Sequence, residues 1–387
     1  MNRLDVTLND AVTTVALDDP VGVANRNWGV VALRVVDELT GEPPRGSISL
    51  TCSNPALTTR VAEDGLVGLA AVPAKVFPGL KTVSYSAGLT IQAAGYLGMS
   101  LTATLPINPA FPASFDPLIL PDLPLHRLPI VFRGRTMRLV AGNLQVAPAA
   151  SVRVSGVWRS LPPANVVIPA EAPNLIALSQ PLYANRANAI SSLARRDLAA
   201  VAGDDKQMMD SLPAGTTTLR LSNRHGLTIG DVLLVEGNRP DREEFLSILA
   251  INGGSTPDQI AQISLQFPTA LSHRQGSLVQ QAVNSGPLGA ANTFTQDGIP
   301  GDTTVFLNGL VGLTPANQVR ISGGAADEFH GFQIYAGQSD PNGYYRLPPL
   351  SRVAQVELQA TDGIHTVKTI VSPNYEQPEN LVDFVFS

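Results

Sequence analysis

The chain has 387 residues, with 33 glycines, 31 prolines and a net charge of −6. This length predicts about two to four domains, and 44% apolar against 15% charged residues excludes an intrinsically disordered chain. The negative net charge excludes a generally basic nucleic-acid binder, and so low a share of charge is expected for a surface that lies against other protein.

Cysteine content and the first residues bear on the cellular compartment. Cys52 is the single cysteine, so no disulfide forms within the chain and nothing indicates an oxidising compartment. The start, Met1 to Asp5, lacks the basic and apolar runs of a secretory signal peptide, and no stretch approaches about 18 consecutive apolar residues, the length of a transmembrane helix. We therefore expect a protein that starts in the cytoplasm and does not insert directly into a membrane.

Residues 1–129 read as an antiparallel β-sandwich followed by a proline-rich connection. Apolar and polar residues alternate in short runs that end at glycine, proline or aspartate turns, as half-buried strands do, at 30–36, 46–51, 85–93 and 99–105. The connection, 106–129, holds seven prolines, so we expect it to be extended and irregular. Because Phe111, Phe115 and its leucines are apolar, it is not a solvated linker and should lie on a protein surface.

The middle of the chain predicts a small β unit and then a helix. Strand-like runs at 130–136 and 150–158 place a small β unit at residues 130–183. Residues 184–212 predict a short helical linker, because their apolar residues fall on one face of a helix and Gly203 could end it; those residues are Ile190, Leu193, Ala194, Leu198 and Val201.

The remaining chain predicts a barrel and a second sandwich. Five short strands within residues 213–285 are typical of a small five-stranded β-barrel, at 217–221, 232–236, 243–251, 262–265 and 277–281. Residues 286–387 again alternate in short strands. The predicted fold is therefore all-β and multi-domain, with β-sandwich modules, a small β-barrel and one short helical linker.

Two segments resemble the carboxypeptidase-regulatory-like, or transthyretin-like, β-sandwich modules. Residues 35–43 (VVDELTGEP) resemble the strand and TG-x-P turn of these modules, with residues 63–69 (EDGLVGL) as a degraded second half. Residues 340–350 (DPNGYYRLPPL) match the later D-x-x-G-x-Y/F-x-L-x-x-L step well. Glycine supplies the positive φ of such a turn. The resemblance implies a transthyretin-like sandwich in residues 286–387.

The layout as a whole is similar to accessory components of phage-tail-like contractile injection particles. The barrel region carries GL-x-x-GD-x-L and E-x-x-x-I patterns, in Gly226-Leu227, Gly230-Asp231, Leu233 and the segment from Glu244 to Ile248. None of these residues is a catalytic signature. The resemblance implies a structural role, although a shared fold does not establish function.

No catalytic, cofactor-binding or metal-binding residue is predicted. The five histidines are too far apart for a zinc-binding helix motif, so a metal site would need ligands from distant loops; they are His126, His225, His273, His330 and His365. Neighbouring acids such as Glu243 and Glu244 point to opposite faces of a strand and cannot act as one pair. Asp340 and Asn342 could bind calcium, but a turn explains them better.

Aromatic side chains are the candidate interface residues. They are Trp28, Phe111, Phe115, Tyr344 and Tyr345. Trp28 follows the polar run of residues 25–27 and is a candidate exposed ring, whereas Trp158 ends an alternating strand and should be buried. Strand alternation places one ring of Tyr344 and Tyr345 inward and the other outward.

These observations favour a non-enzymatic structural or assembly subunit of a large particle, most plausibly a phage-tail-like contractile injection system. Its partners would be other protein subunits, and no nucleic acid or cofactor is expected. The particle would be released or envelope-associated. The alternative is a cell-surface or glycan-binding module, which predicts a shallow groove containing Trp28, Tyr344 or Tyr345. The third hypothesis, a hydrolase, predicts a deep pocket joining a histidine to an acid.

Overall fold

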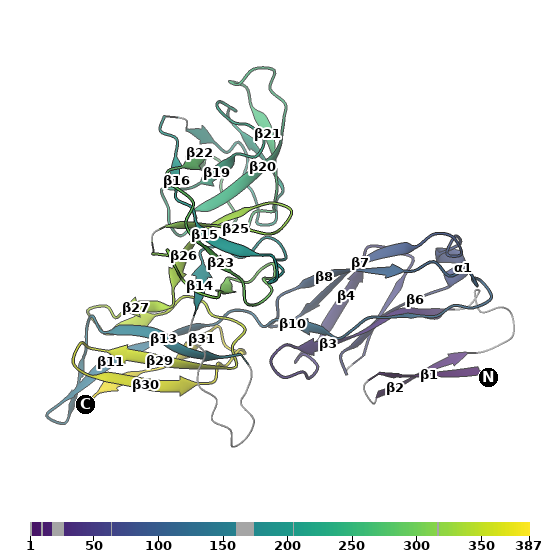
Figure 1. Ribbon diagram of the computed structural model, residues 1–387, viewed down its shortest axis with the longest axis horizontal. Helices are drawn as coiled ribbons and strands as arrows, with labels where there is room; N and C mark the ends of the chain where they lie inside the picture. Colours follow the sequence, from purple (N-terminus) through teal and green to yellow (C-terminus); the bar gives the residue numbers. More distant parts are fainter. Residues whose placement is uncertain are drawn as a thin grey trace. The chain divides into compact units, whose positions relative to one another are not determined.

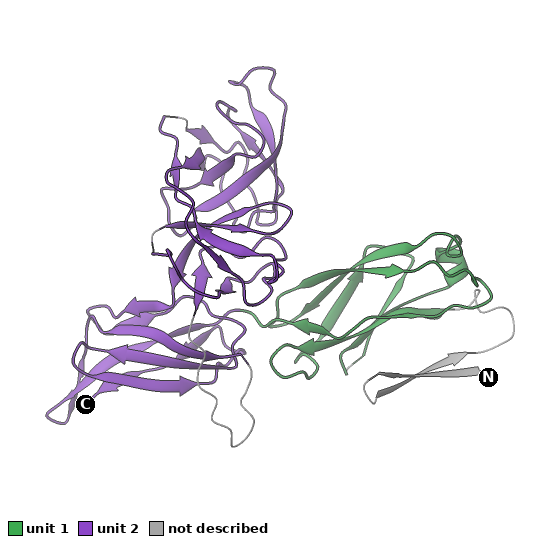
Figure 2. Cartoon of the chain, in the orientation of Figure 1, with its two compact units in different colours: residues 1–128 green, residues 129–387 purple. Residues whose placement is uncertain are grey.

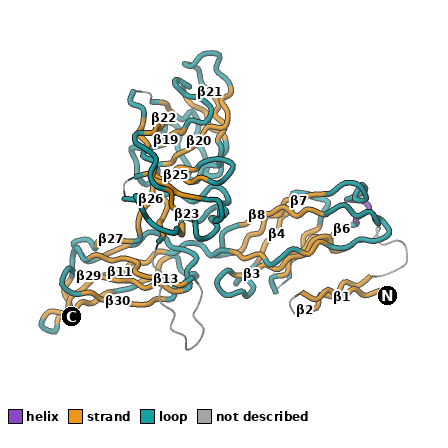
Figure 3. Tube along the Cα trace, viewed as in Figure 1, coloured by secondary structure: helices purple, strands orange, loops and turns teal. Residues whose placement is uncertain are grey.

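The computed structural model describes residues 27–62, 64–159, 174–203, 205–315 and 317–387, together with the backbone of β1 (Asn2–Leu8) and β2 (Ala11–Leu17). The chain divides into two compact units, residues 1–128 and 129–387 (Figure 2). Apart from the short helix α1 (Pro73–Val76), the elements of these ranges are strands (Figure 3), which confirms the all-β, multi-domain prediction. None of the described helices is long and apolar enough to span a membrane.

Residues 27–128 of unit 1 form a sandwich of two sheets around one core. The first sheet contains β3 (Trp28–Asp37), β5 (Thr58–Val61), β6 (Leu66–Ala71), β9 (Leu118–Ile119) and β10 (Leu123–Leu125). The second contains β4 (Ile48–Cys52), β7 (Tyr85–Ala93) and β8 (Met99–Leu105) (Figure 1). Alternate side chains of β3 and β7, such as Leu33 and Ile91, are buried between the sheets, as the period of two requires.

The proline-rich connection belongs to this sandwich. Its short strands β9 and β10 pair in parallel with β3. Phe111 and Phe115 lie in the core of unit 1, with rings 6.5 Å apart in an edge-to-face arrangement. The segment therefore packs along the first domain, and its apolar residues are explained by burial.

Unit 2 begins and ends in a second sandwich, here called the C-terminal sandwich. One sheet holds β11 (Val131–Val140), β12 (Asn143–Val146), β28 (Tyr344–Arg346), β31 (Glu379–Leu381) and β32 (Phe384–Phe386). The other holds β13 (Ser151–Trp158), β27 (Ala336–Gln338), β29 (Gln355–Thr361) and β30 (Thr366–Val371). The early strands thus pair with strands from the end of the chain.

This pairing differs from the predicted division into separate units at residues 130–183 and 286–387. β13 pairs with β29, and β11 pairs with β28, β31 and β32. One hydrophobic core contains residues of both segments, including Phe132, Val152, Tyr345 and Leu358. Local periodicity identifies strands, but it carries no information on which distant strand completes a sheet.

Two further β modules are inserted between β13 and β27. The first is a six-stranded sheet of β14 (Leu175–Leu178), β15 (Ser192–Arg195), β23 (Ala291–Thr293), β24 (Thr304–Phe306), β25 (Gln318–Ser322) and β26 (Glu328–Ile334). The second lies between β15 and β23 in the chain. It holds β16 (Leu198–Ala200), β17 (Lys206–Gln207), β18 (Thr218–Leu221), β19 (Val232–Val235), β20 (Glu244–Asn252), β21 (Ala261–Leu265) and β22 (Leu278–Asn284).

The second inserted module, here called the barrel, is a seven-stranded sheet that contains the segment predicted as a small five-stranded barrel. Its five main strands, β18 to β22, coincide with the predicted runs to within a few residues. The sheet closes because the segment that begins with β17 pairs with β22 on one side, while Met208 bridges Leu221 of β18 on the other. The interior is filled by apolar residues such as Leu233, Ile248 and Val279.

The structure corrects the prediction of a helical linker at residues 184–212. This segment forms β15, β16 and β17 instead of a helix. Leu193 is buried in β15, but Ile190, which a helix would place on the same apolar face, is 69% exposed. The strands form because β23, β25 and β22 supply backbone partners, and tertiary pairing overrides a weak local preference.

Candidate functional site

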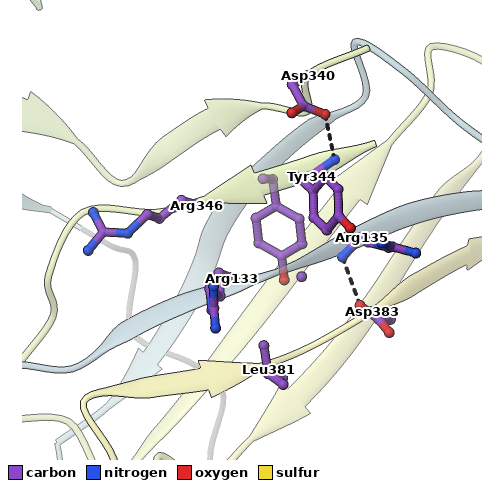
Figure 4. Close-up of a pocket in the computed structure, with 9 residues that line it drawn as sticks. Arg133, Arg135, Asp340, Tyr344, Arg346, Leu381 and Asp383 are labelled. Carbon is purple, nitrogen blue, oxygen red and sulfur yellow. Dashed lines mark hydrogen bonds between the residues drawn. The ribbon is translucent and has the colours of Figure 1, made fainter. Parts of the chain in front are cut away.

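The C-terminal sandwich presents a groove built by strand alternation on β11. Phe132 and Thr136 point into the core, so Arg133 and Arg135 point outward. The antiparallel neighbour β28 places Arg346 opposite Arg133 and Tyr344 opposite Arg135. Three arginines and one aromatic ring are thereby gathered on one sheet face (Figure 4).

The groove has a volume of about 660 Å³, and three arginines, two aspartates and two tyrosines line it together with Gly134 and Leu381. The guanidinium of Arg135 lies over the ring of Tyr344, with its carbon 4.2 Å from the ring centroid. Arg133 forms an ion pair with Glu379 at 2.8 Å between Nη2 and Oε2. Both side chains of that pair are exposed to solvent, so the pair is screened.

Two aspartates fix the backbone at the rim of the groove. The Asp383 Oδ1 atom accepts a 2.7 Å hydrogen bond from the amide of Arg135. The Asp340 Oδ1 atom accepts from the amides of Asn342 and Tyr344, at 2.8 Å each. Asp340 and Asn342 thus form a turn, with Gly343 at a φ of 77°.

Gly134 allows the chain from Leu381 to Asp383 to lie against β11. A Cβ atom on Gly134 would be 1.9 Å from the carbonyl oxygen of Val382. That oxygen also accepts a 2.6 Å hydrogen bond from the hydroxyl of Tyr345. Burial raises the pKa of Tyr345, so its hydroxyl stays protonated and keeps donating this bond. The close approach brings Leu381 and Asp383 to the groove.

Replacing Gly134 with alanine is expected to destabilise the C-terminal sandwich. The added methyl group meets backbone atoms of Val382, and overpacking of this kind costs about 1–3 kcal/mol or more. Urea unfolding measures the loss. Gly29→Ala is the matched control, because no atom lies within 4 Å of the added methyl group and its φ is not positive; equal stability of the two variants would contradict the role given to Gly134.

An apolar surface adjoins the groove on the same face of the sheet. Met137 pairs with Val146 of β12 and with Val385 of β32, and Leu139 pairs with Leu144. Paired residues share a face, so these five side chains form one patch, here called the hairpin patch. Leu144 is 59% exposed and Val146 is 51% exposed. The arginine groove and the hairpin patch are therefore two ends of one sheet face.

The candidate interface residues separate into one exposed ring and four buried ones. Tyr344 is 46% exposed and lies in the groove, whereas Tyr345 is buried in the core, as alternation predicts. Trp28, Phe111 and Phe115 are buried in the core of unit 1, which corrects their assignment as interface residues. The alternation of β3 turns Trp28 inward even though the preceding residues are polar. Trp158 is buried, as predicted.

The barrel contains a buried cation between two carboxylates. His273 Nδ1 lies 3.0 Å from Glu236 Oε2, and its Nε2 lies 2.7 Å from Glu244 Oε2. Since ionised carboxylates only accept, both ring nitrogens donate and the imidazole is protonated. Burial by itself raises the pKa of Glu236, but hydrogen bonds from Arg242, His273 and Ser277 outweigh it and lower the pKa to about 2.

A second buried charge group lies in the six-stranded sheet. Arg186 donates from Nε and Nη2 to Glu328 Oε1, at 3.0 and 2.6 Å. His330 Nε2 lies 3.0 Å from Glu328 Oε2. The Arg186 and Glu328 side chains are both 0% exposed. Burial raises the pKa of Glu328, but His330 and Arg186 outweigh that effect and hold it below its usual value.

Tyr183 connects the two charge groups. Its hydroxyl donates a 2.9 Å hydrogen bond to Glu244 of the barrel, and its amide donates a 3.0 Å bond to Glu328 of the six-stranded sheet. Its ring stacks on His330, with centroids 5.1 Å apart. The carboxylates and histidines here are buried, so the cluster joins the barrel to the six-stranded sheet and offers no surface to a substrate.

Each of the other three histidines lies beside one acidic side chain. His126 contacts Glu38, His225 contacts Asp258, and His365 lies 3.3 Å from Asp362. Among the described residues, no three His, Cys, Asp or Glu side chains gather as a metal site. Cys52 is a half-buried free thiol.

Sequence reasoning missed the three groove arginines and the buried charge clusters. The pattern Arg133-Gly134-Arg135, in a run already predicted as a strand, indicates two arginines on one face, and Arg346 follows Tyr344 at the same spacing. These signals were present in the sequence. The contact of Arg186, in the loop between β14 and β15, with Glu328 of β26 joins residues distant in the chain, and no local pattern indicates it.

No protein-family model matches this chain, and no curated protein matches it significantly. Among solved structures, the chain is similar to the crystal structure of a variant of BcpA, the major pilin subunit of Bacillus cereus. The identity is 8%, the comparison covers 93% of this chain and 99% of the pilin, and the TM-score is 0.21. At that score the likeness carries no argument about fold or function, and the comparisons assign the chain to no family.

Proposed function

We propose that this chain is a structural subunit of a larger assembly and acts through protein–protein contacts. The hairpin patch carries the proposal. Leu139, Leu144, Val146 and Val385 are each at least 40% exposed, and register places them with Met137 on one side of a sheet. A contiguous exposed apolar surface of this kind marks a site of interaction with another protein.

The kind of assembly is proposed from the sequence resemblance alone. A phage-tail-like contractile injection particle is the kind that the layout of sandwich modules and a barrel resembles. The transthyretin-like resemblance of residues 340–350 fits the turn in which Gly343 has a positive φ and Tyr345 points into the core. These features support a sandwich module in the C-terminal part of the chain.

Leu144→Asp tests the docking role of the hairpin patch. The side chain is exposed, so the isolated variant should fold normally, whereas an unpaired charge within an apolar contact costs several kcal/mol. We expect at least about tenfold less of the variant in high-molecular-weight particles. The measurement is size-exclusion chromatography with light scattering, and mass spectrometry of co-eluting proteins, after expression in the native host.

Ile364→Asp is the control, because Ile364 is 79% exposed and does not belong to the hairpin patch. It should enter particles like the unmodified chain. If the unmodified chain is a monomer with no co-eluting partner, or if both variants assemble equally, the docking role of the patch is wrong.

The second candidate function is binding to a glycan or another envelope component. The arginine groove favours it, because this groove is open to solvent and is lined by the exposed Tyr344, one of the aromatic residues that the hypothesis names. Such binding would survive Leu144→Asp, which separates the two candidates. The histidine–carboxylate cluster around His273 is buried, so it supplies no support for a hydrolase.

A further inference from the structure

The arginine groove places groups that only donate hydrogen bonds beside groups that only accept them. Arg133, Arg135 and Arg346 contribute guanidinium donors, and Asp340 and Asp383 contribute carboxylate acceptors. Within the described residues, the guanidinium of Arg346 makes no ion pair or hydrogen bond. The lining therefore carries three positive and two negative charges. A ligand that carries only negative charge would not match both kinds of group.

In each of the two aspartates of the groove, only one carboxylate oxygen accepts hydrogen bonds from the described residues. Asp340 and Asp383 each use Oδ1 to accept backbone amides. In the part of the chain that the structure describes, the Oδ2 atom of each has no hydrogen-bond partner, and both side chains are exposed. These oxygens can accept hydrogen bonds from hydroxyl groups of a ligand.

Apolar surface completes the groove. Tyr344 is 46% exposed and Leu381 is 72% exposed. The guanidinium of Arg135 lies over the Tyr344 ring, and this cation–π contact links the two side chains. A volume of about 660 Å³ lies within the usual range for small-ligand sites. It suits a ligand of one or two sugar rings.

We propose that this groove binds a carboxylate-bearing sugar of the uronic-acid class. Arg346 and Arg133 would hold the carboxylate, since a guanidinium matches its two oxygens. Asp340 and Asp383 would accept from the ring hydroxyls, and Tyr344 with Leu381 would contact the C–H face of the ring. The inference rests on the envelope-binding candidate and does not depend on the assembly role.

An acidic peptide fits the same groove less well. Its carboxylates would meet the arginines, but Asp340 and Asp383 would repel a second acidic side chain and would gain few hydroxyl donors in exchange. A neutral sugar would satisfy the aspartates and leave the guanidinium of Arg346 without a charged partner. A sugar acid is the ligand class that uses both kinds of group.

Isothermal titration calorimetry on the full chain tests whether the groove binds a sugar acid. The probe is a two-residue oligogalacturonate, which matches the size of the groove, and its methyl ester is the matched comparison, because esterification removes the charge and keeps the rings and their hydroxyls. We expect the free acid to bind about 10- to 100-fold more tightly than the ester. The affinity for the acid should fall as salt rises, since the arginines are exposed.

Three variants locate the site. Arg346→Gln and Tyr344→Ala should each weaken binding of the oligogalacturonate by about tenfold or more. Arg153→Gln should leave it unchanged, because Arg153 is an exposed arginine of β13 outside the groove. All three positions are exposed, so circular dichroism should show unaltered folds.

Several outcomes would overturn the proposal. Equal affinity for the acid and the ester would show that the groove does not recognise the carboxylate. Tighter binding of a hexaglutamate peptide would identify an acidic protein segment as the ligand class instead. The absence of binding up to about 10 mM oligogalacturonate, or equal losses with Arg346→Gln and Arg153→Gln, would also refute it. None of these results bears on whether Leu144→Asp blocks assembly.

Discussion

Glu328→Ala is expected to lower the free energy of unfolding of unit 2 by about 3–5 kcal/mol. The carboxylate accepts from Arg186 and His330 and from the amides of Tyr183 and Ala184. Its removal leaves the Arg186 guanidinium, which is 0% exposed, without its counter-charge, and an uncompensated buried charge is strongly destabilising. Urea unfolding measures the change, and hydrogen exchange at β14 and β26 localises it.

Two controls accompany that variant. Asp210→Ala removes one partner of a surface ion pair in which Arg220 and Asp210 are 52% and 49% exposed, and it should cost at most about 1 kcal/mol. The double variant Arg186→Met with Glu328→Leu removes both charges and should recover much of the loss. If Glu328→Ala costs no more than Asp210→Ala, the buried pair does not hold the six-stranded sheet as described.

His273→Gln should remove about 3–5 kcal/mol from the stability of the barrel near pH 6, because it leaves the buried Glu244 carboxylate without its cation. Burial alone lowers the pKa of His273, but Glu244 and Glu236 outweigh burial and raise it. The stabilisation by His273 is therefore complete below its unfolded pKa of about 6.5. It is lost as the pH rises through the higher pKa of the folded state.

Unfolding free energies measured over a range of pH test whether the stability falls as the pH rises. The unmodified chain should lose stability as the pH rises above about 6.5, and His273→Gln should lack that decline. Glu236 has the opposite dependence: its pKa of about 2 means that its stabilisation is present above about pH 4.3 and is lost as the pH falls towards 2. His225→Gln is the control, because His225 is an exposed histidine. If the unfolding free energies of the unmodified chain and of His273→Gln change equally with pH, His273 is not the group that causes the decline.

Strand positions could be predicted because they follow from local alternation and turn residues. The five barrel strands and the inward and outward rings of Tyr345 and Tyr344 are examples. The same reasoning failed at residues 184–212, where apolar residues of helical spacing lie in short strands. There, backbone partners from β22, β23 and β25 decided the structure, and no local pattern reports them.

The groove shows a second limit of sequence reasoning. The sequence predicts aromatic residues as interface candidates, yet Trp28, Phe111 and Phe115 lie in a core, because large apolar rings contribute most when they are buried. The arginines that line the groove were visible in an alternating strand. What could not be inferred is that β28 and β31 lie on either side of β11 and bring Arg346 and Leu381 to the same place.

The pairing of the first and last strands of unit 2 has a mechanical consequence. β11 runs parallel to β31 and β32, so a pull between Pro129 and Ser387 draws β11 and β32 in opposite directions along their lengths. Their hydrogen bonds then bear the load together in shear, instead of opening one after another. The barrel and the six-stranded sheet are inserted between β13 and β27 and lie outside the line of force. Tension passes through the C-terminal sandwich while the inserted modules stay unloaded.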